Sequence, residues 1–250
     1  MRNDIDLCDD GDLAYIRSKT NLTLGEGMLL DEGYRLAHLP LVAPDSSLVI
    51  PTDPGSHYEM GRHPRVFSIV VPIAAEALES SAAYRELERD LAASLLAQKI
   101  AWHVLGSRRE RLHATLCGGL GIRAAPVLDR GLREALAAIG PFVVDVRGLF
   151  SGNVNRGRLY FRIYPERRRG QNMLHVVQRA LGRPTTDLYV AGVWNLTDDL
   201  TAAEAAALSS LVERWWNRSI IRLEVNRLWL LGACDDLVLD GSVEEVLLLT

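Results

Sequence analysis

Short apolar runs alternate with amphipathic segments along residues 66–250, and this alternation predicts strands and helices in turn. Tyr84, Leu87, Leu91 and Leu95 are spaced as on one face of a helix. The polar segment 106–111 joins two strand-like runs and indicates a hairpin. In the first part of this region we expect strands at 66–73, 99–105, 112–120 and 142–150, and helices at 81–97 and 127–139.

The same scheme continues to the end of the chain. Thr201 and Glu204 match a capping box at the start of the last expected helix. Strands are expected at 158–164, 188–196, 221–231 and 243–249, and helices at 171–181 and 202–216. Alternation of this kind predicts an α/β (α+β) sandwich, with antiparallel-rich sheets inside and helices outside.

Residues 1–65 have weak periodicity and many helix and strand breakers. We therefore expect an irregular N-terminal extension with at most short strands, for example at 47–50. Its glycine and proline content would allow it to cover a cleft, and it contains three histidines, His38, His57 and His63. Its breakers are Gly25, Gly27, Gly33, Pro40, Pro44, Pro51, Pro54 and Gly55.

Two segments of the first half can be aligned with two segments of the second half. Residues 112–120 align with 188–196, and 144–150 align with 223–229, with an expected helix between the members of each half. The alignment predicts an internal duplication of the type β-α-β-β. Residues 66–250 would then form one bilobal domain, with halves at about 66–150 and 151–250 and a central cleft between them.

Composition narrows the range of partners. The net charge of −4 argues against a protein that coats long nucleic acid by neutralising many phosphates. The sequence has no apolar run of about 20 residues, so no membrane-spanning helix is expected. The three cysteines lie far apart and the start of the chain is acidic, which favours a cytoplasmic protein with reduced thiols.

The expected strand at 112–120 carries the most suggestive chemistry. Alternation places His113 and Thr115 on one face, about 7 Å apart along the strand, and Leu112 and Ala114 on the other. An imidazole and a hydroxyl would then face the cleft together. Cys117 shares that face, so an enzyme built from His113, Cys117 and N-terminal residues is one alternative, although the strand spacing separates the two side chains.

A His-x-Thr strand within a duplicated α/β domain resembles the two-histidine (2H) phosphoesterase superfamily, which includes RNA ligase-like cyclic phosphodiesterases. The run Arg111-Leu112-His113-Ala114-Thr115-Leu116 carries the resemblance, which covers about 66–250. It implies metal-free hydrolysis of a 2′,3′-cyclic nucleotide or a related cyclic phosphate, with no cofactor. In that chemistry His113 would be the general acid or base, and the Thr115 hydroxyl would hold a phosphate oxygen. The implied partner is a small phosphorylated ligand or nucleotide.

The second half departs from the pattern of that superfamily. Tyr189 and Ala191 stand where a second His-x-Thr motif is expected, and residues 183–200 contain no histidine. A phenol is a poor base at neutral pH, so Tyr189 would be only a substitute hydrogen-bond donor. Asn195 follows on the same strand and would contact a ligand or cap a turn. The alternative function is therefore a non-catalytic module that binds a nucleotide or a phospho-ligand.

Other polar residues are candidates for auxiliary roles. His103 would stand across the hairpin from His113, and Arg109 and Arg111 precede the motif and would reach a phosphate. The adjacent Asp235 and Asp236 are expected to form a solvated turn. Histidines do not occur at ligand spacing with acids or cysteines, so no metal site is expected.

Overall fold

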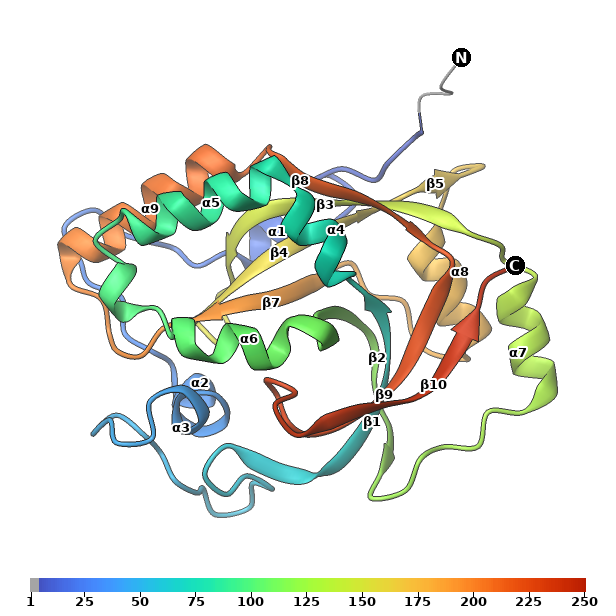
Figure 1. The fold of residues 1–250 in the computed structure, drawn as a ribbon, viewed down its shortest axis with the longest axis horizontal. Helices are drawn as coiled ribbons and strands as arrows, with labels where there is room; N and C mark the ends of the chain where they lie inside the picture. The colour runs from blue at the N-terminus through green and yellow to red at the C-terminus, as the bar shows by residue number, and fades with distance from the viewer. Residues whose placement is uncertain (1–4) are drawn as a thin grey trace.

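The computed structural model describes residues 5–250, which contain two four-stranded antiparallel sheets (Figure 1). The first sheet has the order β10 (Gly241–Leu248), β9 (Arg227–Asp235), β1 (Arg62–Pro72) and β2 (His113–Ile122). The second has the order β7 (Val190–Asn195), β4 (Arg158–Pro165), β3 (Phe142–Ser151) and β8 (Ser219–Val225). A short ribbon of β5 (Arg167–Arg168) and β6 (Gln171–Asn172) extends beyond β4.

Helices lie on the outside of this framework (Figure 1). Two of them, α5 (Ala82–Ala92) and α9 (Ala202–Trp215), run side by side and contact strands β8 and β3 of the second sheet. The other helices that follow β1 are α4 (Ala75–Ser80), α6 (Leu105–Arg108), α7 (Arg130–Ala137) and α8 (Met173–Ala180), with single 3₁₀ turns at Ala97–Lys99, Trp102–Val104 and Arg109–Arg111.

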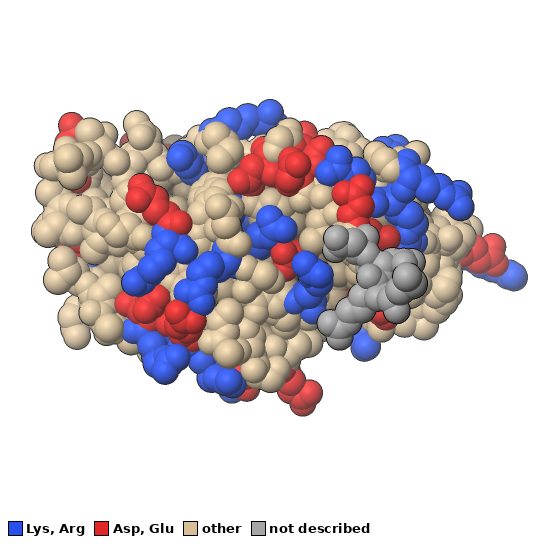
Figure 2. Space-filling model, turned by 90° about the horizontal axis from the view of Figure 1, so that it is seen from above, with Lys and Arg blue, Asp and Glu red and all other residues tan. Residues whose placement is uncertain are grey.

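Ion pairs join the outer helices at the surface. Arg218, after α9, pairs with Glu86 of α5 at 2.6 Å, and Arg214 of α9 pairs with Asp90 of α5 at 2.8 Å. Figure 2 shows basic and acidic side chains intermixed on the face seen from above. Each exposed pair contributes at most about 1 kcal/mol to stability.

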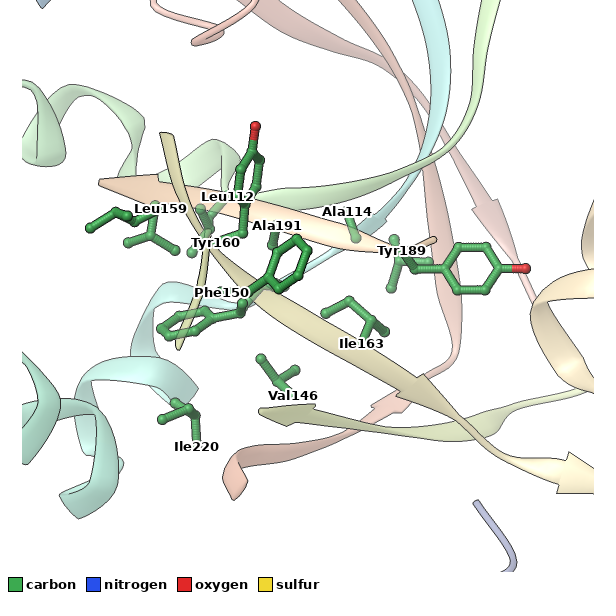
Figure 3. Close-up of a cluster of buried hydrophobic side chains, with 14 of the residues drawn as sticks. Leu112, Ala114, Val146, Phe150, Leu159, Tyr160, Ile163, Tyr189, Ala191 and Ile220 are labelled. Carbon is green, nitrogen blue, oxygen red and sulfur yellow. The ribbon is translucent and has the colours of Figure 1, made fainter. Parts of the chain in front are cut away.

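The two sheets meet where β2 contacts β7 (Figure 3). Leu112 and Ala114 face the interior beside Ala191 and Tyr189, and side chains of β3 and β4 such as Phe150 fill the space below them. These side chains are all buried, so the apolar face of β2 is committed to the core. The opposite face of β2 is left free for polar side chains.

The N-terminal segment is integrated into the same core, contrary to the expectation of an irregular extension. It contains α1 (Tyr15–Ser18), α2 (Glu32–Ala37) and α3 (Leu39–Val42), and no strand forms at 47–50. Tyr15 is fully buried, and its hydroxyl donates to the carbonyl oxygen of Ile163 at 2.7 Å and accepts from the amide of the same residue at 2.9 Å. The hydroxyl of Tyr34 donates to the carbonyl oxygen of Leu196 at 2.6 Å.

Most expected elements are confirmed, with two corrections. The run at 99–105 forms two 3₁₀ turns and the start of α6 instead of a strand, so the hairpin to β2 was a wrong prediction. The run at 221–231 divides into β8 and β9, which lie in different sheets. The capping box of Thr201 and Glu204 is present at the start of α9.

The mixed α/β fold with antiparallel sheets is confirmed, whereas the duplication is not. Residues 144–150 lie within β3, but their expected counterpart at 223–229 crosses from the end of β8 to the start of β9. Each sheet also takes strands from both halves of the chain, because β9 and β10 complete the sheet that β1 and β2 begin.

Candidate functional site

A cavity of about 660 Å³ lies on the face of the first sheet that carries His113 and Thr115. Its size is in the range typical of small-molecule sites. Strands β1, β2 and β9 form its floor, and two loops, at 57–58 and 235–238, form its sides. The lining residues are His57, Tyr58, His63, Pro64, Val66, Ser68, His113, Thr115, Ile122, Arg123, Leu231, Ala233, Asp235, Asp236 and Val238.

His113 and Thr115 reach the cavity because residues alternate between the two faces of a strand. Their neighbours Leu112 and Ala114 are buried in the core, so the register of β2 cannot shift by one residue without burying the imidazole. Thr115 pairs with Val70 of β1 across the ladder. The sheet thereby fixes the side on which both polar groups lie.

The environment of His113 favours the neutral imidazole. Nδ1 lies 2.6 Å from the carbonyl oxygen of Arg111 and donates to it, so the lone pair is on Nε2. Burial lowers the pKa of His113 to about 4, and the positive charges of Arg158 and Arg108 act in the same direction. His113 is therefore a free base at neutral pH.

The environment of His63 favours the opposite protonation state. Nε2 lies 3.3 Å from Oδ1 of Asp236, and Nδ1 lies 2.8 Å from the carbonyl oxygen of Pro64. Both neighbours are acceptors, and only the imidazolium has a proton for each of them. The contact with Asp236 raises the pKa of His63 above its ordinary value, although burial opposes this effect.

Asp236 is the centre of a small polar cluster. Its Oδ2 accepts a hydrogen bond from the hydroxyl of Tyr58 at 2.8 Å and lies 4.0 Å from Nε2 of the buried His38. Burial disfavours charge on this carboxyl, but the His63 contact, His38, the Tyr58 hydrogen bond and Arg158 together lower its pKa to about 2. Asp236 is thus ionised at every pH above about 2, including neutral pH.

His38 lies behind this cluster and stacks on Tyr34, with 5.2 Å between ring centroids. Neither ring nitrogen has a hydrogen-bond partner among residues 5–250. Burial lowers the pKa of His38 to about 3, and the charge of Arg158 adds to the effect. His38 is therefore neutral at neutral pH, and it does not line the cavity, so it is not a candidate proton carrier.

The loop at 235–240 is held from several sides. The buried Asp235 carboxylate accepts backbone hydrogen bonds from Leu237, Leu239 and Asp240 at 2.8–3.0 Å. This network keeps the loop rigid, even though Val238 has a φ of 57°. A positive φ is rare for a β-branched residue and persists only where the surroundings impose it.

Two arginines, the buried Arg108 and the half-buried Arg158 of β4, join the loop to the second sheet. Arg108 donates from Nε to the carbonyl oxygen of Leu237 at 2.9 Å, and from Nη1 and Nη2 to those of Val193 and Gly192 at 2.8 and 2.7 Å. Arg158 donates to the carbonyl oxygen of Asp236 at 3.0 Å. A Cβ at Gly192 would lie 1.9 Å from Nε of Arg158, so only glycine allows this guanidinium to pass.

Tyr189 and Asn195, the candidates from the second half, do not line the cavity. Tyr189 is 1% exposed, and its hydroxyl donates to the carbonyl oxygen of Thr186 and lies 3.2 Å from Oε1 of Gln178. Burial raises its pKa further above that of a free phenol. Asn195 is fully buried and accepts from Arg108 at 3.3 Å. Both positions lie on β7 or just before it, where the strand packs against the core.

The auxiliary candidates also lie outside the cavity lining. His103 is exposed on a 3₁₀ turn and does not stand across a hairpin from His113. Arg109 pairs with Glu79 at 2.6 Å, and Arg111 donates to the carbonyl oxygens of Gly241 and Ser107. Burial raises the pKa of Cys117 to about 11, so its thiol is protonated and a poor nucleophile at neutral pH.

The sequence did not identify His63, Ser68 and Arg123 as residues of a cavity. Asp235 and Asp236 were predicted to lie in a solvated turn. That assignment is wrong for Asp235, which is 2% exposed. The only signals available were three histidines in a glycine- and proline-rich segment and one pair of adjacent acids. Neither signal reveals that the two segments meet.

No protein-family model and no curated protein matches this sequence. Within residues 5–250, no cluster of three or more histidine, cysteine or acidic residues is arranged to hold a metal ion. In the same part of the chain, no helix combines the length and the apolar character needed to cross a membrane.

Proposed function

We propose that the chain is a phosphoesterase that hydrolyses a small cyclic phosphate, such as a 2′,3′-cyclic nucleotide, with His113 as general base and His63 as general acid. The observation that carries the proposal is that two imidazoles line one cavity and that their surroundings move their pKa values in opposite directions. Pairs of groups whose environments push their pKa values apart are the usual arrangement for acid–base catalysis. The resemblance of the His113-x-Thr115 strand to two-histidine phosphoesterases supports the same chemistry.

The reaction needs no group beyond the side chains and water. Nε2 of His113 takes a proton from water while the water oxygen bonds to phosphorus. The bond from phosphorus to the leaving oxygen breaks, and the imidazolium of His63 gives its proton to that oxygen. The hydroxyls of Thr115 and Ser68 line the same cavity and would hold the non-bridging oxygens.

Arg123 supplies a positive charge at the rim of the cavity. It makes no ion pair with a carboxylate in the part of the chain that the structure describes, so its guanidinium is available to an anion. Guanidinium groups bind phosphate oxygens in pairs, which favours an anionic phosphoester over a neutral ester.

Hydrolysis of 2′,3′-cyclic nucleotides without added metal tests the proposal. His113→Gln and His63→Gln should each lower kcat/KM by about 10²–10⁴, the usual contribution of a general acid or base. His103→Gln is the matched control, because this histidine is exposed and outside the cavity. Activity that survives both cavity substitutions would contradict the proposal.

A non-catalytic binding module is the second candidate. The position of Tyr189 favours it, because the strand that would carry a second histidine in a two-histidine enzyme contributes nothing to the cavity. Ligand binding that depends on Thr115 and Arg123, with no turnover by the unmodified chain, would support this candidate over the enzyme.

A further inference from the structure

The cavity has an apolar wall that the chemistry at phosphorus does not use. Val66 of β1 lies between Ile122 of β2 and Ala233 of β9 in one row across the sheet, because Val66 pairs with both. Leu231 lies in the next row beside Ser68. All four apolar side chains line the cavity.

Val238 completes this wall from the opposite side. It packs against Val70 and Leu231 as a small cluster separate from the main core. The backbone at Val238 has a φ of 57°, a conformation that is strained for a β-branched residue. The hydrogen bonds of Asp235 hold this conformation and keep the isopropyl group over the floor of the cavity.

The wall lies at a definite distance from the polar groups. Val66 is two residues from Ser68 along β1, which is about 7 Å for a strand. Thr115 pairs with Val70, another step of two residues in the same direction. A phosphate held by the two hydroxyls would therefore carry its organic group toward Val66, Ile122 and Ala233 rather than into solvent.

We propose that this wall is a subsite for an apolar or aryl group esterified to the phosphate, so that the ligands are phosphoesters of apolar alcohols. The proposal rests on the proposed function, because it places the phosphate beside Thr115 and Ser68. None of the five wall side chains, Val66, Ile122, Leu231, Ala233 and Val238, can donate or accept a hydrogen bond. The wall thus favours ligands with a large apolar area, and it cannot form hydrogen bonds with the polar edge of a nucleobase.

Equilibrium binding of two probes tests the subsite. Phenyl phosphate and methyl phosphate carry the same charged group and differ in apolar area. Burial of the ring should make phenyl phosphate bind about ten- to fiftyfold more tightly. Ile122→Ser and Val66→Thr should each reduce this ratio about three- to tenfold, since both make the wall polar.

Leu95→Ser is the matched control. Leu95 and Ile122 are both 62% exposed, but Leu95 lies outside the cavity, so its substitution should leave the ratio unchanged. Val66→Thr keeps the β-branched shape of the side chain. It therefore tests the wall independently if Ile122→Ser fails to fold. A ratio near one in the unmodified chain, or a ratio that neither wall variant changes, would overturn the subsite.

The same measurements separate the subsite from the proposed function. If the chain hydrolyses no cyclic phosphate but the probe ratio responds to the wall variants, the catalytic proposal fails and the subsite stands. If hydrolysis depends on His113 but the ratio is near one, only the subsite fails. Tighter binding of a 2′,3′-cyclic nucleotide than of phenyl phosphate, unchanged in the wall variants, would also overturn the subsite.

Discussion

The carboxylate of Asp236 lies 3.3 Å from Nε2 of His63 and joins the end of β9 to the start of β1. This contact raises the pKa of one imidazole of the cavity, while among residues 5–250 no acidic neighbour does the same for His113. The difference between the two histidines therefore depends on the loop at 235–240, which the buried Arg108 and the half-buried Arg158 anchor to the second sheet.

The pH dependence of kcat/KM follows from these two environments. Activity should rise through about pH 4, where His113 loses its proton, and fall above pH 6.5, where His63 loses its own. In Asp236→Asn the falling limb should move to lower pH, because a neutral amide no longer stabilises the imidazolium. Asp240→Asn is the control, since Asp240 pairs with Arg62 at the surface. An unchanged falling limb in Asp236→Asn would contradict the role given to this carboxylate.

Stability should decrease in acid because His38 is buried in its neutral form. Above pH 6.5 His38 is neutral in both states, and its full contribution is present. As the pH falls, the unfolded chain takes up the proton first, so stability is lost from pH 6.5 down to about 3. His38 alone accounts for about 3 kcal/mol of loss between pH 7 and pH 4.

Urea unfolding at several pH values measures this loss. His38→Phe keeps the stacking on Tyr34 and removes the titration, so its stability should change less between pH 7 and pH 4. The exposed His103 provides the comparison. In His103→Phe the free energy of unfolding should change with pH as it does in the unmodified chain. If the free energy of unfolding changed equally with pH in all three proteins, His38 would not be buried in its neutral form.

Arg108 should be a major determinant of stability. Arg108→Met keeps much of the volume but leaves the carbonyl oxygens of Leu237, Val193 and Gly192 without donors, at a cost of about 3 kcal/mol. Arg109→Met removes only an exposed ion pair with Glu79 and should cost less than about 1 kcal/mol. The two free energies of unfolding are directly comparable, and similar values would contradict the anchoring role.

Val238→Gly should separate stability from binding. Glycine adopts a positive φ without strain, which offsets most of the apolar burial lost with the isopropyl group, so stability should change by about 1 kcal/mol or less. The preference for phenyl phosphate should nevertheless fall. Val193→Gly is the control, because Val193 is equally buried in β7 without a positive φ and should lose about 3 kcal/mol or more. A large loss of stability in Val238→Gly would contradict the interpretation that the positive φ strains the backbone at Val238.

The sequence predicted those elements that are marked by short-range patterns, such as a capping box or the alternation of polar and apolar residues. The capping box of Thr201 and Glu204 marks the start of α9, and alternation in β2 places Leu112 inward and His113 outward. The strand predicted at 99–105 was wrong because its apolar residues form 3₁₀ turns. The indole of Trp102 donates a hydrogen bond to the carbonyl oxygen of Ala97 at 2.9 Å in this region. Short apolar runs fit a strand and a buried turn equally well.

The site was harder to predict because its partners are distant in the chain. Tyr58 and Asp236 are 178 residues apart, and only the pairing of β1 with β9 brings them together. Periodicity gives the inward face of one strand, but it does not give the order of strands in a sheet. His63 was therefore visible in the sequence as a histidine but not as the neighbour of a carboxylate.

The buried N-terminal segment also affects how the chain folds during synthesis. The hydrogen-bond partner of Tyr15, Ile163, leaves the ribosome 148 residues after it. Until β4 has been made, the apolar side chains of residues 5–42 have no surface on which to pack. This segment is thus synthesised well before the strand that it packs against, and during that interval aggregation or chaperone binding competes with folding.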